Sequence, residues 1–129
     1  MDVLEHIEDD HAEMARAAAV LRPGGRLLVL CPAHQWLFSP FDHSIGHFRR
    51  YTERMFREIT PPDLKLVRLV YLDTIGLLAS LGNKLVLRRS MPNLAQITVW
   101  DRFMIPISRL ADPLLGYTLG KSVLGIWCK

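Results

Sequence analysis

The fold is decided by one short stretch near the amino terminus, Leu21-Arg22-Pro23-Gly24-Gly25-Arg26-Leu27-Leu28-Val29-Leu30. Its Pro-Gly-Gly centre ends a helix, because glycine tolerates the left-handed backbone that a tight exit needs. Residues 26–31 form a short and nearly all-apolar run, as expected of a strand that is buried on both faces of a parallel sheet. A helix, a glycine turn and a buried strand in this order predict an α/β fold.

Periodic segments on either side of this stretch agree with that prediction. The expected elements are helices over residues 10–21 and 52–60 and strands over residues 26–31, 64–72 and 123–127. Asp10 is the expected cap of the first helix, because Glu13 follows it at the spacing of a capping box. Thr52 is the expected cap of the second helix.

Residues 73–118 have a different character and predict an inserted apolar helical pair. Ile75–Leu87 is strongly apolar and precedes Arg88-Arg89. A second run of apolar residues has alternating spacings of three and four, which is typical of a helical seam: Trp100, Phe103, Ile107, Leu110 and Leu114. We expect this pair to complete the core or to form a dimer interface. The alternative is a lid over a lipid-like acceptor, or a helix resting on a membrane surface.

Composition limits the class of protein. The chain has 129 residues, 50% of them hydrophobic and 22% charged, which fits one globular domain. A net charge of +3 is too small to indicate nucleic-acid binding. Two cysteines with no metal spacing favour a reducing, cytoplasmic location. No apolar run approaches the roughly 20 residues of a membrane-spanning helix, so we expect a soluble protein.

The segment from Ala33 to Tyr51 loses helical and strand periodicity and is rich in histidine and aromatic residues. It follows the strand over 26–31, and ligands bind at the carboxyl ends of strands in such sheets. An aromatic-lined pocket with a few polar groups suits a small molecule. The residues expected to contact that molecule are Trp36, Phe41, Arg49 and Tyr51. The alternative is that the histidines are solvated and the arginines pair with acidic residues.

Three motifs together resemble a known family. They are Asp2-Val3-Leu4-Glu5-His6-Ile7, the stretch over 21–30, and His43-Ser44-Ile45-Gly46-His47-Phe48-Arg49-Arg50-Tyr51-Thr52. In this order they resemble the carboxy-terminal half of a class I S-adenosylmethionine-dependent methyltransferase domain. The resemblance covers most of residues 2–72.

The resemblance implies an incomplete Rossmann-like methyltransferase fold. The strands over 26–31, 64–72 and 123–127 would be its fifth, sixth and antiparallel seventh strands. Residues 1–129 would form a single partial domain, with residues 73–118 as a helical insertion within it.

The first motif implies a cofactor contact. By resemblance, Asp2, Val3 and Leu4 lie near the methionine and sulfonium part of S-adenosylmethionine. The alternative is that the acidic residues merely favour the amino end of a helix. Some quinone-precursor O-methyltransferases hold a divalent ion with a similar acidic-x-x-Glu-His group, for which Asp2, Glu5 and His6 have suitable donor atoms. Because many relatives with this motif need no metal, we expect none here.

The loop implies the catalytic groups. Methyl transfer from a sulfonium is an in-line displacement, helped by a base when the acceptor must lose a proton. Histidine titrates near neutrality, so His47 is the first candidate base and His34 the second. Asp42 is the expected partner that orients the imidazole.

The sequence thus predicts an S-adenosylmethionine-dependent methyltransferase with a small-molecule acceptor. The chain begins after the fourth strand of that fold, so we expect it to be truncated and to lack the glycine-rich cofactor loop. An exposed strand edge would then favour a homodimer or pairing with a missing amino-terminal half. The alternative is a non-catalytic interaction or dimerisation module that uses the apolar helices.

Overall fold

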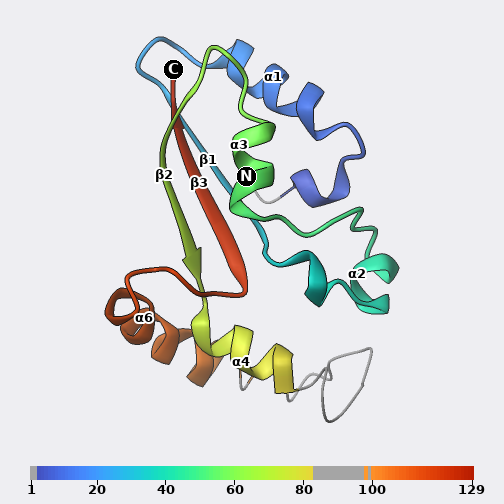
Figure 1. Ribbon diagram of the computed structural model, residues 1–129, viewed down its shortest axis with the longest axis vertical. Helices are drawn as coiled ribbons and strands as arrows, with labels where there is room; N and C mark the ends of the chain where they lie inside the picture. The colour runs from blue at the N-terminus through green and yellow to red at the C-terminus, as the bar shows by residue number, and fades with distance from the viewer. Residues whose placement is uncertain (1–2, 83–97, 99) are drawn as a thin grey trace.

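The computed structural model describes residues 3–82, 98 and 100–129, and these form an α/β structure with a three-stranded sheet (Figure 1). The strands are β1 (Arg26–Pro32), β2 (Lys65–Leu72) and β3 (Ser122–Cys128). The α-helices are α1 (Asp10–Val20), α2 (Pro40–Ser44), α3 (Glu53–Glu58), α4 (Thr74–Gly82) and α6 (Ile105–Leu114). Short 3-10 helices η1 (Leu4–His6) and η2 (Gln35–Leu37) and a π-helical turn η4 (Trp100–Met104) complete the described elements.

The sheet has the order β1-β3-β2, and β3 pairs antiparallel with both neighbours. Gly125 of β3 lies opposite Val29 of β1 and Leu69 of β2. The two outer strands therefore run in the same direction without pairing to each other. The strand positions expected from the sequence are confirmed, but the expectation that β1 pairs within a parallel sheet is wrong for these strands.

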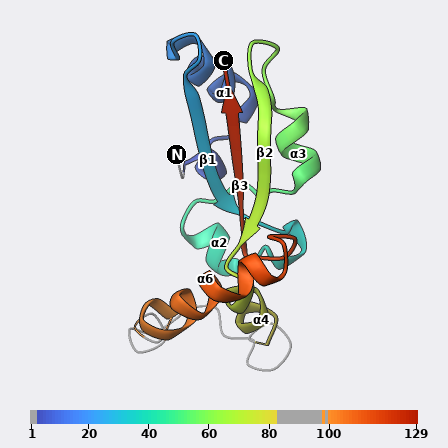
Figure 2. The same ribbon diagram turned by 90° about the vertical axis from the view of Figure 1, so that its left-hand side faces the viewer.

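Helices cover one face of the sheet. Figures 1 and 2 show α1 and α3 on the same side of the three strands. Val29 is buried on that side, whereas its neighbour Leu28 is 48% exposed on the other. The expectation that β1 is buried on both faces is therefore wrong in this structure. An all-apolar strand predicts cover on two sides, but among the described residues only one side has it.

The core lies between the sheet and these helices. Its largest fully buried side chains include Trp127, Tyr51 and Phe56, and the Phe56 and Trp127 rings lie 5.4 Å apart. Gly125 makes this packing possible, because a Cβ at that position would overlap the Trp127 ring. The Trp127 indole N–H donates to the Thr60 hydroxyl at 2.9 Å, so its polar atom is satisfied.

The caps of the first two main helices differ in how well the sequence predicts them. Thr52 caps α3, as expected, by accepting a hydrogen bond from the Met55 N–H. The cap of α1 is Asp9, which accepts from the Ala12 N–H at 3.0 Å, so the prediction of Asp10 is wrong. Asp10 is instead buried, where it accepts a hydrogen bond from a tyrosine of the site loop.

The helices α4 and α6 lie together at one end of the sheet (Figures 1 and 2). The face of α6 towards α4 is polar and carries buried Ser108 and Asp112. The apolar seam predicted from the sequence faces away, with Leu110 at 73% and Leu114 at 86% exposure. For these residues, the interpretation that the seam completes the core is wrong.

Two further features concern this helical pair. Pro106 lies in the first turn of α6, directly after the π-helical turn η4, where a proline is tolerated. The predicted segment Ile75–Leu87 continues beyond α4 into residues 83–87, which lie outside the described residues. Within the described part of the chain, no helix has both the length and the apolar character needed to cross a membrane.

Candidate functional site

The site is built on the loop between β1 and α3. Its two ends are joined by backbone hydrogen bonds, from the Tyr51 N–H to the Pro32 carbonyl (2.8 Å) and from the His34 N–H to the Tyr51 carbonyl (2.9 Å). The short helix α2 lies inside the loop and begins with a capping box formed by Ser39 and Asp42. The loop is therefore a closed and internally bonded structure at the carboxyl end of β1.

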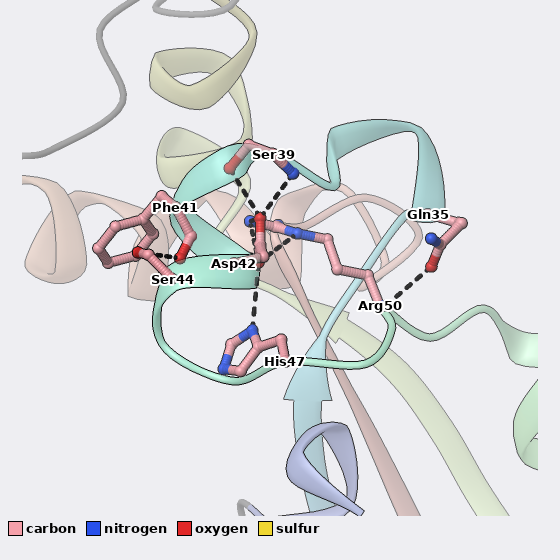
Figure 3. Close-up of polar contacts among 7 residues, drawn as sticks. All are labelled: Gln35, Ser39, Phe41, Asp42, Ser44, His47 and Arg50. Carbon is pink, nitrogen blue, oxygen red and sulfur yellow. Dashed lines mark hydrogen bonds and ion pairs between the residues drawn. The ribbon is translucent and has the colours of Figure 1, made fainter. Parts of the chain in front are cut away.

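The carboxylate of Asp42 organises this loop (Figure 3). It is 1% exposed and accepts hydrogen bonds from Arg50 Nε (2.9 Å) and Nη2 (3.0 Å). The N–H and hydroxyl of Ser39 donate to it as well. Burial alone would raise the pKa of Asp42, but the Arg50 and Ser39 hydrogen bonds outweigh it and lower the pKa. Asp42 is therefore an ionised carboxylate at neutral pH.

His47 is held by Asp42, as the sequence analysis expected. Its Nδ1 lies 3.2 Å from Asp42 Oδ1, and its side chain is 11% exposed. An ionised carboxylate only accepts hydrogen bonds, so Nδ1 carries the proton and donates it. In the neutral form of the ring, the other nitrogen, Nε2, is the one that carries the lone pair. The predicted contact is confirmed, and the role of His47 as a base stays a prediction.

His47 lies beside the first motif of the sequence at a cavity of about 290 Å³. The lining residues are Glu5, His6, Leu30, Cys31, Pro32, His47 and Ser122. The Phe48 N–H donates to the Glu5 carbonyl at 2.7 Å, and the His6 and His47 rings lie 4.5 Å apart, edge to face. Residues of η1 and of the site loop thus line one cavity at the carboxyl end of β1.

The three predicted cofactor residues have different positions. Asp2 lies outside the described residues. Val3 is exposed and is adjacent to η1. Leu4 is fully buried in the core, where its carbonyl accepts a hydrogen bond from the Tyr51 hydroxyl at 3.2 Å. Of these residues, the structure leaves the Val3 side chain accessible to a ligand.

Two of the predicted substrate residues join the loop to α1. Arg49 forms an ion pair with Asp10 and donates to the Glu8 carbonyl at 2.6 Å. The Tyr51 hydroxyl donates to Asp10 Oδ2 at 2.8 Å, and the ring is 0% exposed. Burial and then the Asp10 hydrogen bond raise the pKa of Tyr51. In this conformation Tyr51 is out of reach of a bound acceptor, and Arg49 is engaged by acidic and carbonyl oxygens.

The other candidates lie apart from the cavity. His34 has a φ of +66°, its Nε2 lies 2.9 Å from the Gly120 carbonyl, and its ring stacks on Tyr71 at 5.0 Å. Burial lowers the pKa of His34, and the charge of Arg50 adds to this effect. Trp36 is exposed beside His34, and the Phe41 ring points away from the Asp42 carboxylate (Figure 3). His34 and His47 thus face different neighbours.

Sequence reasoning missed Lys121. Burial and then the nearby charge of Arg50 lower the pKa of Lys121 to about 8. Lys121 directly precedes β3 and follows Gly120, whose carbonyl contacts His34. A single lysine before a strand gives no signal of burial. The Ser39–Asp42 capping box was also missed, although its spacing and the intervening Pro40 make it recognisable.

No family model matches the chain, and no curated protein matches it.

Proposed function

We propose that the chain forms the substrate side of a class I S-adenosylmethionine-dependent methyltransferase domain that acts on a small molecule. The observation that carries this proposal is the cavity at which η1 meets His47. The sequence resemblance assigns residues 2–4 to the sulfonium end of the cofactor, and the chemistry of histidine makes His47 the first candidate base for the acceptor. Methyl donor and acceptor must be adjacent for an in-line displacement. The proposal is supported by the His6 ring, two residues after Leu4, which lies 4.5 Å from the His47 ring.

The direction of the strands supports the Rossmann-like part of the proposal. β1 and β2 run in one direction and β3 in the other. This is the direction expected of the fifth, sixth and antiparallel seventh strands. The loop that carries His47 follows the carboxyl end of β1, the edge at which ligands bind in open α/β sheets.

The proposed chemistry uses Nε2 of His47 as a general base. Nε2 would accept the proton of the acceptor, and S-adenosylmethionine would supply the methyl group to the deprotonated acceptor atom and leave as S-adenosylhomocysteine. Asp42 holds the tautomer that presents Nε2 and stabilises the imidazolium that forms. His34 is the second candidate base, but it is not among the residues that line the cavity, so the geometry favours His47.

The experiment is a titration of the ¹⁵N-labelled chain with S-adenosylhomocysteine, followed by amide NMR shifts. We expect weak binding, with Kd on the order of 1 mM, since the matched motifs supply one side of a cofactor site. Shifts should concentrate at residues 3–6 and 46–48. Val3→Asp places a charge beside η1 and should weaken binding at least about tenfold, or ~1.4 kcal/mol.

The matched control is Val20→Asp, which introduces the same change at an exposed position of α1 away from the cavity. It should leave the affinity unchanged. Absence of any shift, or shifts confined to α4 and α6, would overturn the proposed cofactor site.

A second candidate function is a non-catalytic interaction or dimerisation module. It is favoured by the outward apolar face of α6 and by the open sheet face around Leu28 and Val67. Large exposed apolar patches mark interaction sites. In the methyltransferase proposal the same helix would instead contact a lipid-like acceptor. A cytoplasmic location belongs to the proposal as well, supported by Cys31 and Cys128, which form no disulfide bond among the described residues.

A further inference from the structure

A cluster of nitrogen and oxygen donors lies at the mouth of the same cavity. We propose that Glu5, His6 and His47 bind a divalent transition-metal ion of the zinc class. This inference goes beyond the proposed methyl transfer and does not depend on it. It also departs from the sequence analysis, which expected no metal and named Asp2, a residue outside the described range, as the third donor.

The donor atoms of these three residues converge. One donor atom from each of these three residues lies within 4.8 Å of the other two, in the part of the chain that the structure describes. Bonds to zinc are about 2.0–2.2 Å long, so ligand atoms around one ion lie roughly 3–4 Å apart. Small side-chain rotations would close the set. The exposed His6 has the freedom to make them.

His47 is held in place by a hydrogen bond to a carboxylate. Its Nδ1–H donates to Asp42, and Nε2 points away from that carboxylate (Figure 3). Metal-bound histidines characteristically donate their other ring N–H to a carboxylate or carbonyl, which fixes the tautomer and increases ligand basicity. Asp42 is itself fixed by Arg50 and Ser39. The structure thus holds a preformed outer shell for one ligand.

Backbone hydrogen bonds join the two segments that carry the donors. The Phe48 N–H donates to the Glu5 carbonyl at 2.7 Å, and the His47 N–H donates to the Asp42 carbonyl at 2.9 Å. Gly46 has a φ of +82°, a conformation that favours glycine and turns the loop towards His6. The donors are therefore held by hydrogen-bonded backbone on both sides.

The donor set indicates the class of ion. Two imidazoles and one carboxylate suit zinc and its neighbours, as in sites with three protein ligands and an open fourth position. That position would face the cavity and take water or an anionic ligand atom. Mg²⁺ prefers six oxygen ligands, so it fits this set poorly.

Metal binding and base catalysis use the same atom. An Nε2 that binds an ion accepts no proton, so the two states of His47 exclude each other. The two proposals also fail separately. A chain that binds zinc but not S-adenosylhomocysteine overturns the proposed function alone, and the opposite result overturns the metal site alone.

The test is calorimetric titration of the metal-free full chain with ZnCl₂, together with the visible absorption of the Co²⁺-loaded chain. We expect one ion per chain and a micromolar or tighter Kd. His6→Ala removes an exposed ligand without disturbing the core, and Glu5→Gln keeps the shape of a buried one. Each should weaken binding by at least about tenfold and change the Co²⁺ spectrum.

The matched controls are His43→Ala, an exposed histidine of the same loop, and Cys128→Ser, which removes a thiol that could hold zinc adventitiously. Both should keep the wild-type affinity. The proposal is overturned by absence of binding, by binding that survives both His6→Ala and Glu5→Gln, by loss of binding in Cys128→Ser, or by displacement of zinc by equimolar Mg²⁺.

Discussion

Asp112 of α6 accepts hydrogen bonds from the backbone N–H groups of Asp73 (2.8 Å) and Thr74 (2.9 Å), so one helix caps the start of the other. The Thr74 hydroxyl donates to the same carboxylate at 2.7 Å. A carboxylate at this position satisfies N–H groups that lack helical partners and interacts favourably with the helix dipole. Two helices that are apolar in sequence are thus joined by a buried polar contact.

Asp112→Ala should loosen α4. The change leaves buried N–H donors without their acceptor and should lower the free energy of unfolding by about 2–3 kcal/mol. Hydrogen exchange should accelerate at residues 74–77. Arg109→Ala, on an exposed face of the same helix, is the control and should cost less than about 0.5 kcal/mol. Unchanged exchange in Asp112→Ala would contradict the capping role.

Tyr51→Phe should destabilise the junction between the site loop and α1. The change removes the hydrogen bond to Asp10 but keeps the ring in the core. We expect a loss of about 1–2 kcal/mol in urea denaturation, because the Asp10 carboxylate loses a donor while it stays buried. Tyr117→Phe, at a partly exposed ring, should cost clearly less. Equal costs would show that the hydroxyl of Tyr51 contributes nothing specific.

Stability should fall in acid because of Asp10 and Asp42. Both have a pKa below the ordinary value of 3.8, so each folded carboxylate binds protons less readily than its unfolded counterpart. Their contribution to stability is complete above about pH 4 and is lost as the pH falls further. Asp42→Asn should flatten the pH dependence of the free energy of unfolding below pH 3.8. An unchanged slope would mean that this carboxylate is not selectively stabilised in the folded state.

Lys121 should act in the opposite pH range. Its folded pKa of about 8 lies below the ordinary 10.5, so the charged amine opposes folding below pH 8 and ceases to do so by pH 10.5. Lys121→Met should therefore be more stable than the wild type at neutral pH, by up to roughly 3 kcal/mol. The difference should shrink as the pH rises to 10.5. A difference that stays constant with pH would contradict the lowered pKa.

Leu110→Glu tests the interaction-module candidate. Leu110 lies at the centre of the outward apolar face of α6, so a charge there should weaken self-association measured by sedimentation velocity. Val20→Glu makes a similar change at an exposed position of α1 and is the control. If both variants and the wild type sediment as monomers at high concentration, α6 is not a dimer interface.

The sequence predicts the elements of this fold better than their environments. Apolar runs located all three strands, and the helices expected over residues 10–21 and 52–60 contain α1 and α3. The same runs predicted that Leu28 and the seam containing Leu110 would be buried, and both are exposed. Hydrophobicity reports how a residue would gain from burial, but the partner that covers it is a property of tertiary structure.

The site was predicted in part for a similar reason. The short spacing from Asp42 to His47 made their contact foreseeable, whereas the approach of His47 to Glu5 and His6 depends on how the loop folds back onto η1. The burial of Lys121 depends on its position where β3 enters the sheet. Contacts between segments distant in sequence leave no local pattern.

The central place of β3 in the sheet has a consequence for how the chain is made. β1 and β2 do not pair with each other, and among the described residues every strand pair includes residues 122–128, which are synthesised after both. The sheet therefore cannot form during synthesis of the first 121 residues. Until β3 has been synthesised, the backbone N–H and C=O groups at the edges of β1 and β2 have no strand partner, which favours slow folding and recognition by chaperones.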